Sequence, residues 1–226
     1  GVTVAVLHGY DQVLVSQEAS ANEGNVLFHD KEINHQYSKS FHFEKTFRDY
    51  VQTYLTKTHQ FFSFLRPLNE FQISLLFSQT PQYFGSFRSC NVGAKKDMWC
   101  GACAKCAFIY LALFPFVPYE QMVAIFGSDL FIKSEIIGLV RELVGLTDAK
   151  PFECVGTKDE AKLALALSIA RYQSLGKEVP QTLLAIEKEL PGLNIEKLKK
   201  TVIDAWNSEH FVPDLYVKIL KERLEK

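Results

Sequence analysis

Five cysteines occur in the 226 residues, and four of them are close together, at Cys90, Cys100, Cys103 and Cys106. Their spacing is C-x9-C-x2-C-x2-C. Zn²⁺ is bound by four thiolates in closed structural sites, and two-residue spacers let one tight knuckle present several sulfurs to the same ion. The spacing therefore predicts a structural zinc site with tetrahedral geometry.

Three other kinds of cysteine chemistry compete with zinc. A disulfide framework is disfavoured because the chain is long and poor in cysteine. An iron–sulfur cluster fits C-x2-C-x2-C, but Ala107-Phe108 stands where a ferredoxin would continue with Cys-Pro. Residues 99–103 read WCGAC, as in thioredoxin-like redox pairs, yet they follow a polar loop instead of a buried strand. Zinc is favoured, and the redox and iron–sulfur interpretations remain open.

Composition sets broad limits on the class of protein. With 47% hydrophobic and 23% charged residues, the chain is typical of a soluble globular protein with one large or two small domains. A formal net charge of −1 gives no support to nucleic-acid binding. The longest apolar stretch, 107–117, is about half of a membrane span. We expect a cytoplasmic protein with no membrane partner, of undetermined oligomeric state.

The elements that position a site begin with a short apolar segment at 12–16, which predicts a buried strand. A run of small and polar residues follows it at 16–25. This order is typical of a ligand-binding loop at the carboxyl end of a parallel strand, although a solvated turn has the same composition.

A second polar stretch, 33–40, precedes an amphipathic helix predicted over 43–55 with Ser40 as its N-cap. The start of this helix could face a phosphate or carboxylate, or Ser40 could simply cap it. Asn69 and Gln72 have the spacing of a capping box at the start of the next helix.

From Cys106 onward the sequence predicts mainly helices, at 134–144, 158–175, 195–206 and 214–224. Composition shifts near residue 133 from aromatic and strand-bearing to rich in Lys, Glu, Ala and Leu. We therefore expect two regions, an α/β domain over 1–132 with the metal segment at 90–106, and a helical region over 133–226. The fifth cysteine, Cys154, would by default be a small buried hydrophobe.

Several segments together resemble the UDP-N-acetylmuramoyl-L-alanyl-L-glutamate epimerase family. They are 13–25 (VLVSQEASANEGN), 33–44 (INHQYSKSFHFE), 66–77 (RPLNEFQISLLF), 89–108 with SCN and WCGACAKCAF, and 151–160 with PFECVGT. The cysteine segment also resembles, more loosely, the end of the 7-cyano-7-deazaguanine synthase family. Both are PP-loop ATP pyrophosphatases. The resemblance therefore implies part of a doubly wound α/β sheet, followed by a helical C-terminal region with a four-cysteine zinc site.

The resemblance also implies a reaction in peptidoglycan precursor synthesis. The terminal L-Glu of UDP-MurNAc-L-Ala-L-Glu would be inverted to D-Glu, using ATP and Mg²⁺, through an acyl-adenylate. A free carboxylate disfavours a second negative charge at Cα, whereas a neutral adenylate delocalises it, so an ordinary base can remove the proton. The glycine-rich phosphate loop of PP-loop enzymes is absent here. We therefore expect a C-terminal part of a longer protein that is inactive alone.

Residue roles follow from the resemblance and from the loops described above. Nucleotide or Mg²⁺ contacts are expected from Glu18, Asn22 and Asn25, and proton transfer from His35 or Cys154. Substrate contacts are expected from Gln36, Tyr37, Ser38, Lys39, Arg66 and Glu153. Two alternative functions remain: another PP-loop adenylating ligase or nucleobase-modifying enzyme, and a non-catalytic zinc-stabilised binding module.

Overall fold

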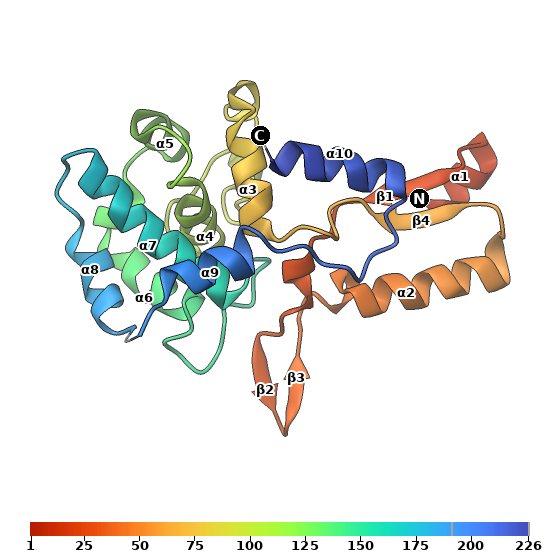
Figure 1. Cartoon of the computed structure of the whole chain (residues 1–226), viewed down its shortest axis with the longest axis horizontal. Coiled ribbons are helices and arrows are strands. Elements are labelled where there is room, and N and C mark those ends of the chain that lie inside the picture. The colour runs from red at the N-terminus through yellow and green to blue at the C-terminus, as the bar shows by residue number, and fades with distance from the viewer. Residues whose placement is uncertain (191, 226) are drawn as a thin grey trace.

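The computed structural model describes residues 1–190 and 192–225. It is a mixed α/β structure that is mostly helical, with two small sheets. Figure 1 shows a compact helical body, from which an arm of helices and strands built by the N-terminal residues extends. The coarse prediction of an α/β part followed by helices is confirmed, whereas the described residues build only one parallel strand pair of the expected doubly wound sheet.

The arm contains this parallel pair, β1 (Gln12–Val15) and β4 (Gln60–Ser63), with Val13 opposite Phe61. The predicted strand at 12–16 is therefore present. Its expected burial is wrong, because Leu14 is 45% exposed. Parallel sheets are normally covered on both faces. In the described residues, this cover comes in part from the C-terminal helix, whose Tyr216 packs near Phe62 and Phe64.

Two helices accompany the strand pair. They are α1 (Val2–His8) and α2 (Phe41–Tyr50), and α2 continues into a π-helical turn, Val51–Leu55. The predicted helix over 43–55 and its cap are confirmed, since Ser40 Oγ accepts the N–H of Phe43 at 3.1 Å. An antiparallel hairpin, β2 (Val26–Phe28) and β3 (Lys31–Ile33), projects from the arm.

The helical body is organised around α4 (Ala104–Leu113), all of whose residues are buried. The other helices that surround or extend from it are α3 (Glu70–Ser78), α5 (Tyr119–Phe126), α6 (Ser134–Leu143), α7 (Lys158–Ser174), α8 (Gln181–Lys188), α9 (Ile195–Val202) and α10 (Asp214–Leu224). Short 3₁₀ turns occupy Ala19–Asn22, Tyr37–Lys39, Pro81–Tyr83, Ala94–Lys96 and Leu130–Ile132. The hydrophobic core runs from Phe71 to Val202 and continues across residue 133.

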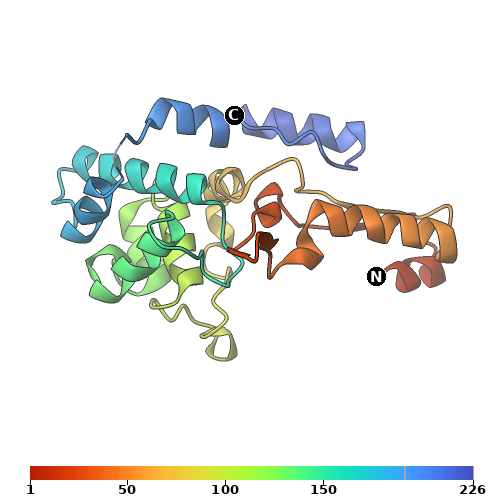
Figure 2. The ribbon, with the colours of Figure 1, turned by 90° about the horizontal axis from the view of Figure 1, so that it is seen from below.

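Two capping boxes fix the ends of helices that matter below. Asn69 and Gln72 cap α3 reciprocally, as predicted, and Thr157 and Glu160 cap α7 in the same way. The predicted helix over 195–206 ends earlier, at Val202. The carbonyls of Ile203 and Ala205 accept hydrogen bonds from Gln72 Nε2 instead of continuing the helix. In Figure 2, α9 and α10 lie along one side of the molecule, over both the body and the arm.

None of the helices in the described ranges is long and apolar enough to cross a membrane.

Candidate functional site

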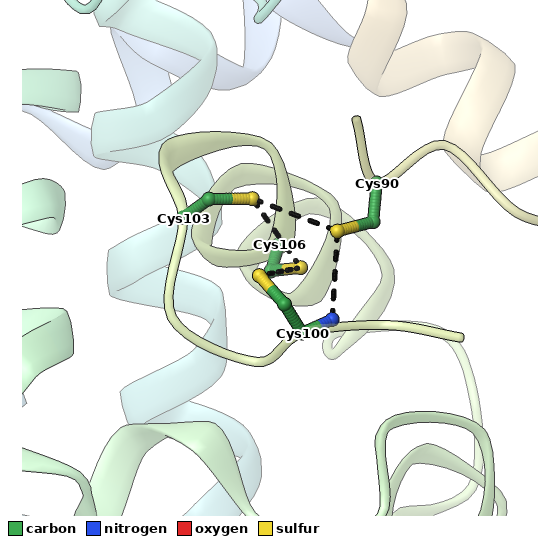
Figure 3. Close-up of side chains that lie close together, drawn as sticks. All are labelled: Cys90, Cys100, Cys103 and Cys106. Carbon is green, nitrogen blue, oxygen red and sulfur yellow. Dashed lines mark hydrogen bonds between the residues drawn. The ribbon is translucent and has the colours of Figure 1, made fainter. Parts of the chain in front are cut away.

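The four clustered cysteines point their sulfurs toward one another, as Figure 3 shows. All four sulfur atoms lie within 4.8 Å of one another, and three of the separations are 3.5, 3.7 and 3.9 Å. A tetrahedral Zn²⁺ with Zn–S bonds of about 2.3 Å places its sulfurs about 3.8 Å apart. Disulfide sulfurs are about 2.05 Å apart, so none of these pairs is a disulfide. The cluster therefore has the size of a four-thiolate metal site.

Local backbone structure prepares this cluster for thiolates. The N–H groups of Gly93 and Cys100 both point at Cys90 Sγ, at 3.1 and 3.4 Å. Burial raises the pKa of Cys90, but these hydrogen bonds outweigh it and lower the pKa to about 7. Cys103 is the N-cap of α4 and Cys106 lies in its first turn. An ion at this position would thus fix the start of the central helix.

Lys105 lies between two of these cysteines and points away from them into a second, ionisable cluster. Its side chain is about 90% buried, and its ammonium lies 3.6 Å from the carboxylate of Glu70. The same ammonium donates a hydrogen bond to the backbone carbonyl of Cys154. Lys105 therefore joins α4, the start of α3 and the 151–157 loop at one point.

The thiol of Cys154 has a charged partner of its own. Lys39 Nζ donates to Cys154 Sγ at 2.9 Å, across 115 residues of sequence. Burial lowers the pKa of Lys39, but the hydrogen bond and the charge of Cys154, with Glu18 and Glu70 nearby, raise it above its ordinary value. Lys39 thus stays an ammonium in hydrogen-bond contact with the Cys154 sulfur. Two residues predicted separately, Lys39 and Cys154, are in contact.

Glu70 lines a cavity of about 370 Å³ at the carboxyl end of β1. Its polar lining comes from Ser16, Glu18, Glu70, Ser74, Ser89 and Lys105, and the remaining walls are apolar. Burial raises the pKa of Glu70 to about 8, and the neighbouring carboxylates Glu18 and Glu160 act in the same direction, against the opposing effect of Lys105. Glu70 is therefore a carboxyl group whose proton occupancy changes near neutral pH.

The 3₁₀ turn Ala19–Asn22 is held beside this cavity by Glu160, a buried carboxylate. Glu160 accepts from Ser20 Oγ at 2.5 Å, from the N–H of Phe71 at 2.7 Å and from the N–H of Thr157 at 3.0 Å. One side chain thus joins the loop after β1, the start of α3 and the start of α7.

Other predicted site residues form a neighbouring network. Asn25 Oδ1 lies 2.8 Å from His35 Nδ1, and Asn25 Nδ2 donates to the carbonyl of Pro151 at 2.7 Å. Burial and the charges of Lys150 and Lys39 lower the pKa of His35, partly opposed by Glu153. His35 is exposed at the surface. The network places His35 beside the loop that carries Cys154.

The remaining predicted residues are more dispersed. Asn22 Oδ1 accepts the N–H of Phe41 at 2.8 Å, Tyr37 Oη lies 2.8 Å from His42 Nδ1, and Glu153 Oε2 accepts from Asn91 at 2.7 Å. Ser38 is exposed. The amide of Gln36 is buried, and neither of its polar atoms has a hydrogen-bond partner among the described residues. The nucleotide and substrate roles expected for these residues stay predictions.

Arg66 holds the loops together from inside the protein. Its fully buried guanidinium bonds Glu44 at 3.0 Å, the carbonyl of Glu18 at 2.7 Å and the carbonyl of Lys39 at 2.6 Å. It therefore positions the two segments that carry Glu18 and Lys39. The substrate contact expected for Arg66 stays a prediction.

Arg66→Ala is expected to destabilise the protein by about 3–5 kcal/mol, because Glu44 would be left buried without its counter-charge. Denaturant unfolding followed by circular dichroism measures this difference. Arg141→Ala breaks the exposed Arg141–Glu189 pair and serves as the matched control, with an unfolding midpoint close to wild type. Equal stability of both variants would contradict the positioning role.

Two central residues, Glu70 and Lys105, were missed from the sequence. Glu70 reads there as an ordinary acidic residue in the first turn of a capped helix, and Lys105 as a solvated charge in the cysteine segment. Only a weak sequence feature could have identified them. Lys105 lies next to the predicted metal ligand Cys106, so the direction of its side chain is set once the cysteine segment folds.

Together, the fold and site define a mixed α/β protein with a four-cysteine metal-type cluster and an adjacent buried acid–base cluster. Comparison with known proteins identifies the family. Residues 1–64 match the family model of the MurL N-terminal domain, and residues 86–197 match that of the MurL C-terminal domain. The chain belongs to the MurL epimerase family.

Three relatives carry the same name, UDP-N-acetyl-alpha-D-muramoyl-L-alanyl-L-glutamate epimerase. That of Xanthomonas oryzae pv. oryzae is 37% identical over 94% of this chain and 48% of its own length. That of a Micromonospora strain is 35% identical over 98% of this chain and 50% of its own length. That of Salinispora tropica is 38% identical over 74% of this chain and 37% of its own length. The chain thus spans about half the length of the first two. No solved structure matches it.

Proposed function

We propose that this chain forms part of an enzyme that inverts the terminal L-Glu of UDP-MurNAc-L-Ala-L-Glu to D-Glu in peptidoglycan precursor synthesis. The observation that carries this proposal is the match to both MurL domains in order along the chain, with 37% identity to a named epimerase over 94% of its residues. The relatives' names give the substrate, and the site supplies chemistry that suits it.

Inversion at Cα needs a base to remove a proton and an acid to return one. The proposed route first converts the α-carboxylate to an acyl-adenylate with ATP and Mg²⁺, because the free carboxylate would repel the charge that develops at Cα. Of the two candidate bases, Cys154 is the better placed, since it is partly buried and bonded to an ammonium. His35 is exposed and its Nδ1 is already close to Asn25.

The remaining assignments rest on position. Glu18 lines the cavity after β1 and is the best-placed residue of the nucleotide or Mg²⁺ group, whereas Asn22 and Asn25 are engaged with the protein backbone. Lys39, with its neighbours Gln36, Tyr37 and Ser38 and with Glu153 across the loop, is proposed to contact the anionic dipeptide. The four cysteines are proposed to hold a structural Zn²⁺, which would fix α4 and Lys105.

The assay for this function uses the complete protein that contains these residues. We expect it to convert UDP-MurNAc-L-Ala-L-Glu to the D-Glu form only when ATP and Mg²⁺ are present, and chiral chromatography of the hydrolysed glutamate reads the product. UDP-MurNAc-L-Ala alone, without the glutamate, is the control substrate. Cleavage of ATP with the glutamate left wholly in the L form would indicate an adenylating ligase instead.

A further inference from the structure

Glu70 is a buried acid–base group whose place in the proposed reaction is unassigned. Glu70 is largely buried, lines the cavity beside β1 and pairs with Lys105, yet the sequence analysis gave it no role. Cys154 lies on the other side of the same lysine, whose ammonium contacts the Cys154 carbonyl. Lys105 therefore links the Glu70 carboxyl group to the backbone of the residue that carries the Cys154 thiol.

These two groups have opposite electrostatic surroundings. Cys154 Sγ accepts a hydrogen bond from the Lys39 ammonium at 2.9 Å, so a cationic donor lies against its sulfur. Glu70 faces Glu18 from the loop after β1 and Glu160 from α7, which favour the neutral acid. Lys105 from α4 and Lys39 from the turn Tyr37–Lys39 oppose this effect, as does the first-turn position of Glu70 in α3. A thiol beside a cationic donor and a buried carboxyl group beside other carboxylates suit the two roles of an acid–base pair.

We propose that Cys154 and Glu70 are the two proton-transfer residues of the epimerisation, Cys154 removing the Cα proton and Glu70 returning one to the opposite face. This assignment rests on the proposed function. The Cys154 thiolate takes the Cα proton, the C–H bond breaks and its electron pair enters the enolate of the activated carboxyl group. The neutral Glu70 carboxyl then donates its proton and forms the new C–H bond. Each turnover leaves a Cys154 thiol and a Glu70 carboxylate, which reset by proton exchange with water.

Lys105 has a defined part in this scheme, as a positioning residue. Its ammonium contacts the Glu70 carboxylate and the Cys154 carbonyl, so it ties Glu70 to the loop that carries Cys154 and offsets the charge that Glu70 acquires after donation. Because Lys105 lies between Cys103 and Cys106, a metal ion held by the four cysteines would also fix the Lys105 backbone. The four-cysteine cluster and the Glu70–Lys105 cluster are thus structurally coupled.

The test separates three steps in the complete protein in D₂O: pyrophosphate release, deuterium entry into L-Glu, and formation of D-Glu. Glu70→Gln is expected to release pyrophosphate and to incorporate deuterium into L-Glu at rates within about threefold of the wild type. Its rate of D-Glu formation is expected to fall by about a hundredfold or more. Cys154→Ser is expected to keep pyrophosphate release and to lose both deuterium entry and inversion by similar factors. Glu187→Gln, on the exposed face of α8, is the matched control and should perform all three steps.

A measurement on the wild type avoids any effect of substitution on folding. A neutral Glu70 is the acid, and burial raises its pKa to about 8, so its proton is present below that pH and lost above it. The ratio of D-Glu formed to deuterium entry into L-Glu should therefore fall above about pH 8. A ratio that stays constant across this pH range would overturn the assignment. So would a Glu70→Gln protein that forms D-Glu within about threefold of the wild-type rate, or one that loses pyrophosphate release together with inversion. A wild-type protein that forms no D-Glu would instead overturn the proposed function.

Discussion

Cys103→Ser is expected to remove the metal from the chain and to destabilise the helical body severely. The sulfur of Cys103 lies 3.5 Å from that of Cys106 and 3.9 Å from that of Cys90, so it belongs to the cluster on two sides. Apparent binding free energies of structural Zn²⁺ reach about 10–16 kcal/mol, and binding free energy is folding free energy when the site exists only in the folded state. Loss of one of four thiolates should lower the melting temperature by well over about 10 °C.

Elemental analysis and thermal unfolding together measure this result. The wild type should contain about one zinc per chain, as expected for one tetrahedral site. Cys154→Ser, at the cysteine that lies outside the cluster, should keep its zinc and serves as the control. A folded wild type without metal would contradict the site, and visible absorbance with bound iron would replace zinc by an iron–sulfur cluster.

Lys39→Met is expected to slow proton removal at Cα by about a hundredfold or more, within the usual range for general acid–base groups. The Lys39 ammonium is the hydrogen-bond donor to Cys154 Sγ, and its removal takes the cationic partner away from the proposed base. Met keeps much of the side-chain volume, so packing should change little. Deuterium entry into L-Glu by the complete protein measures the step.

The matched control is Lys45→Met, because Lys45 is an exposed lysine on α2. It should leave deuterium entry unchanged. Lys39→Arg should recover part of the rate, since it restores a positive donor near the sulfur with a different geometry. A Lys39→Met protein that exchanges its substrate at the wild-type rate would exclude Cys154 as a base that depends on this ammonium.

The sequence predicted the local features of this molecule better than its long-range ones. The cysteine spacing predicted the cluster, and the Ser40 cap and the Asn69–Gln72 capping box were predicted because each depends on residues only a few positions apart. Likewise, the segments expected around the site converge: Lys39 contacts Cys154, and Asn25 contacts both His35 and the 151–157 loop.

The features that were not predicted depend on contacts between distant segments. Arg66 reads in sequence as a free cation, but the fold buries it against Glu44, 22 residues away, and two carbonyls. Glu70 and Lys105 meet only because α3 and α4 pack together, and no periodicity in either helix reveals that pair. Leu14 reads as a buried strand residue, yet in the described residues no element covers its face fully. Pairing of this kind is set by tertiary packing.

The most direct test of the account is the isotopic composition of the product made in D₂O. The complete protein, supplied with UDP-MurNAc-L-Ala-L-Glu, ATP and Mg²⁺, should yield D-Glu that carries one deuterium at Cα, with AMP and pyrophosphate formed alongside. Mass spectrometry of the chirally resolved glutamate reads this result. Deuterium must enter because the proton delivered to Cα comes from a side chain that has already exchanged its proton with solvent. D-Glu without deuterium would contradict proton transfer at Cα by this site. Cleavage of ATP while the glutamate stays L and unlabelled would contradict it as well.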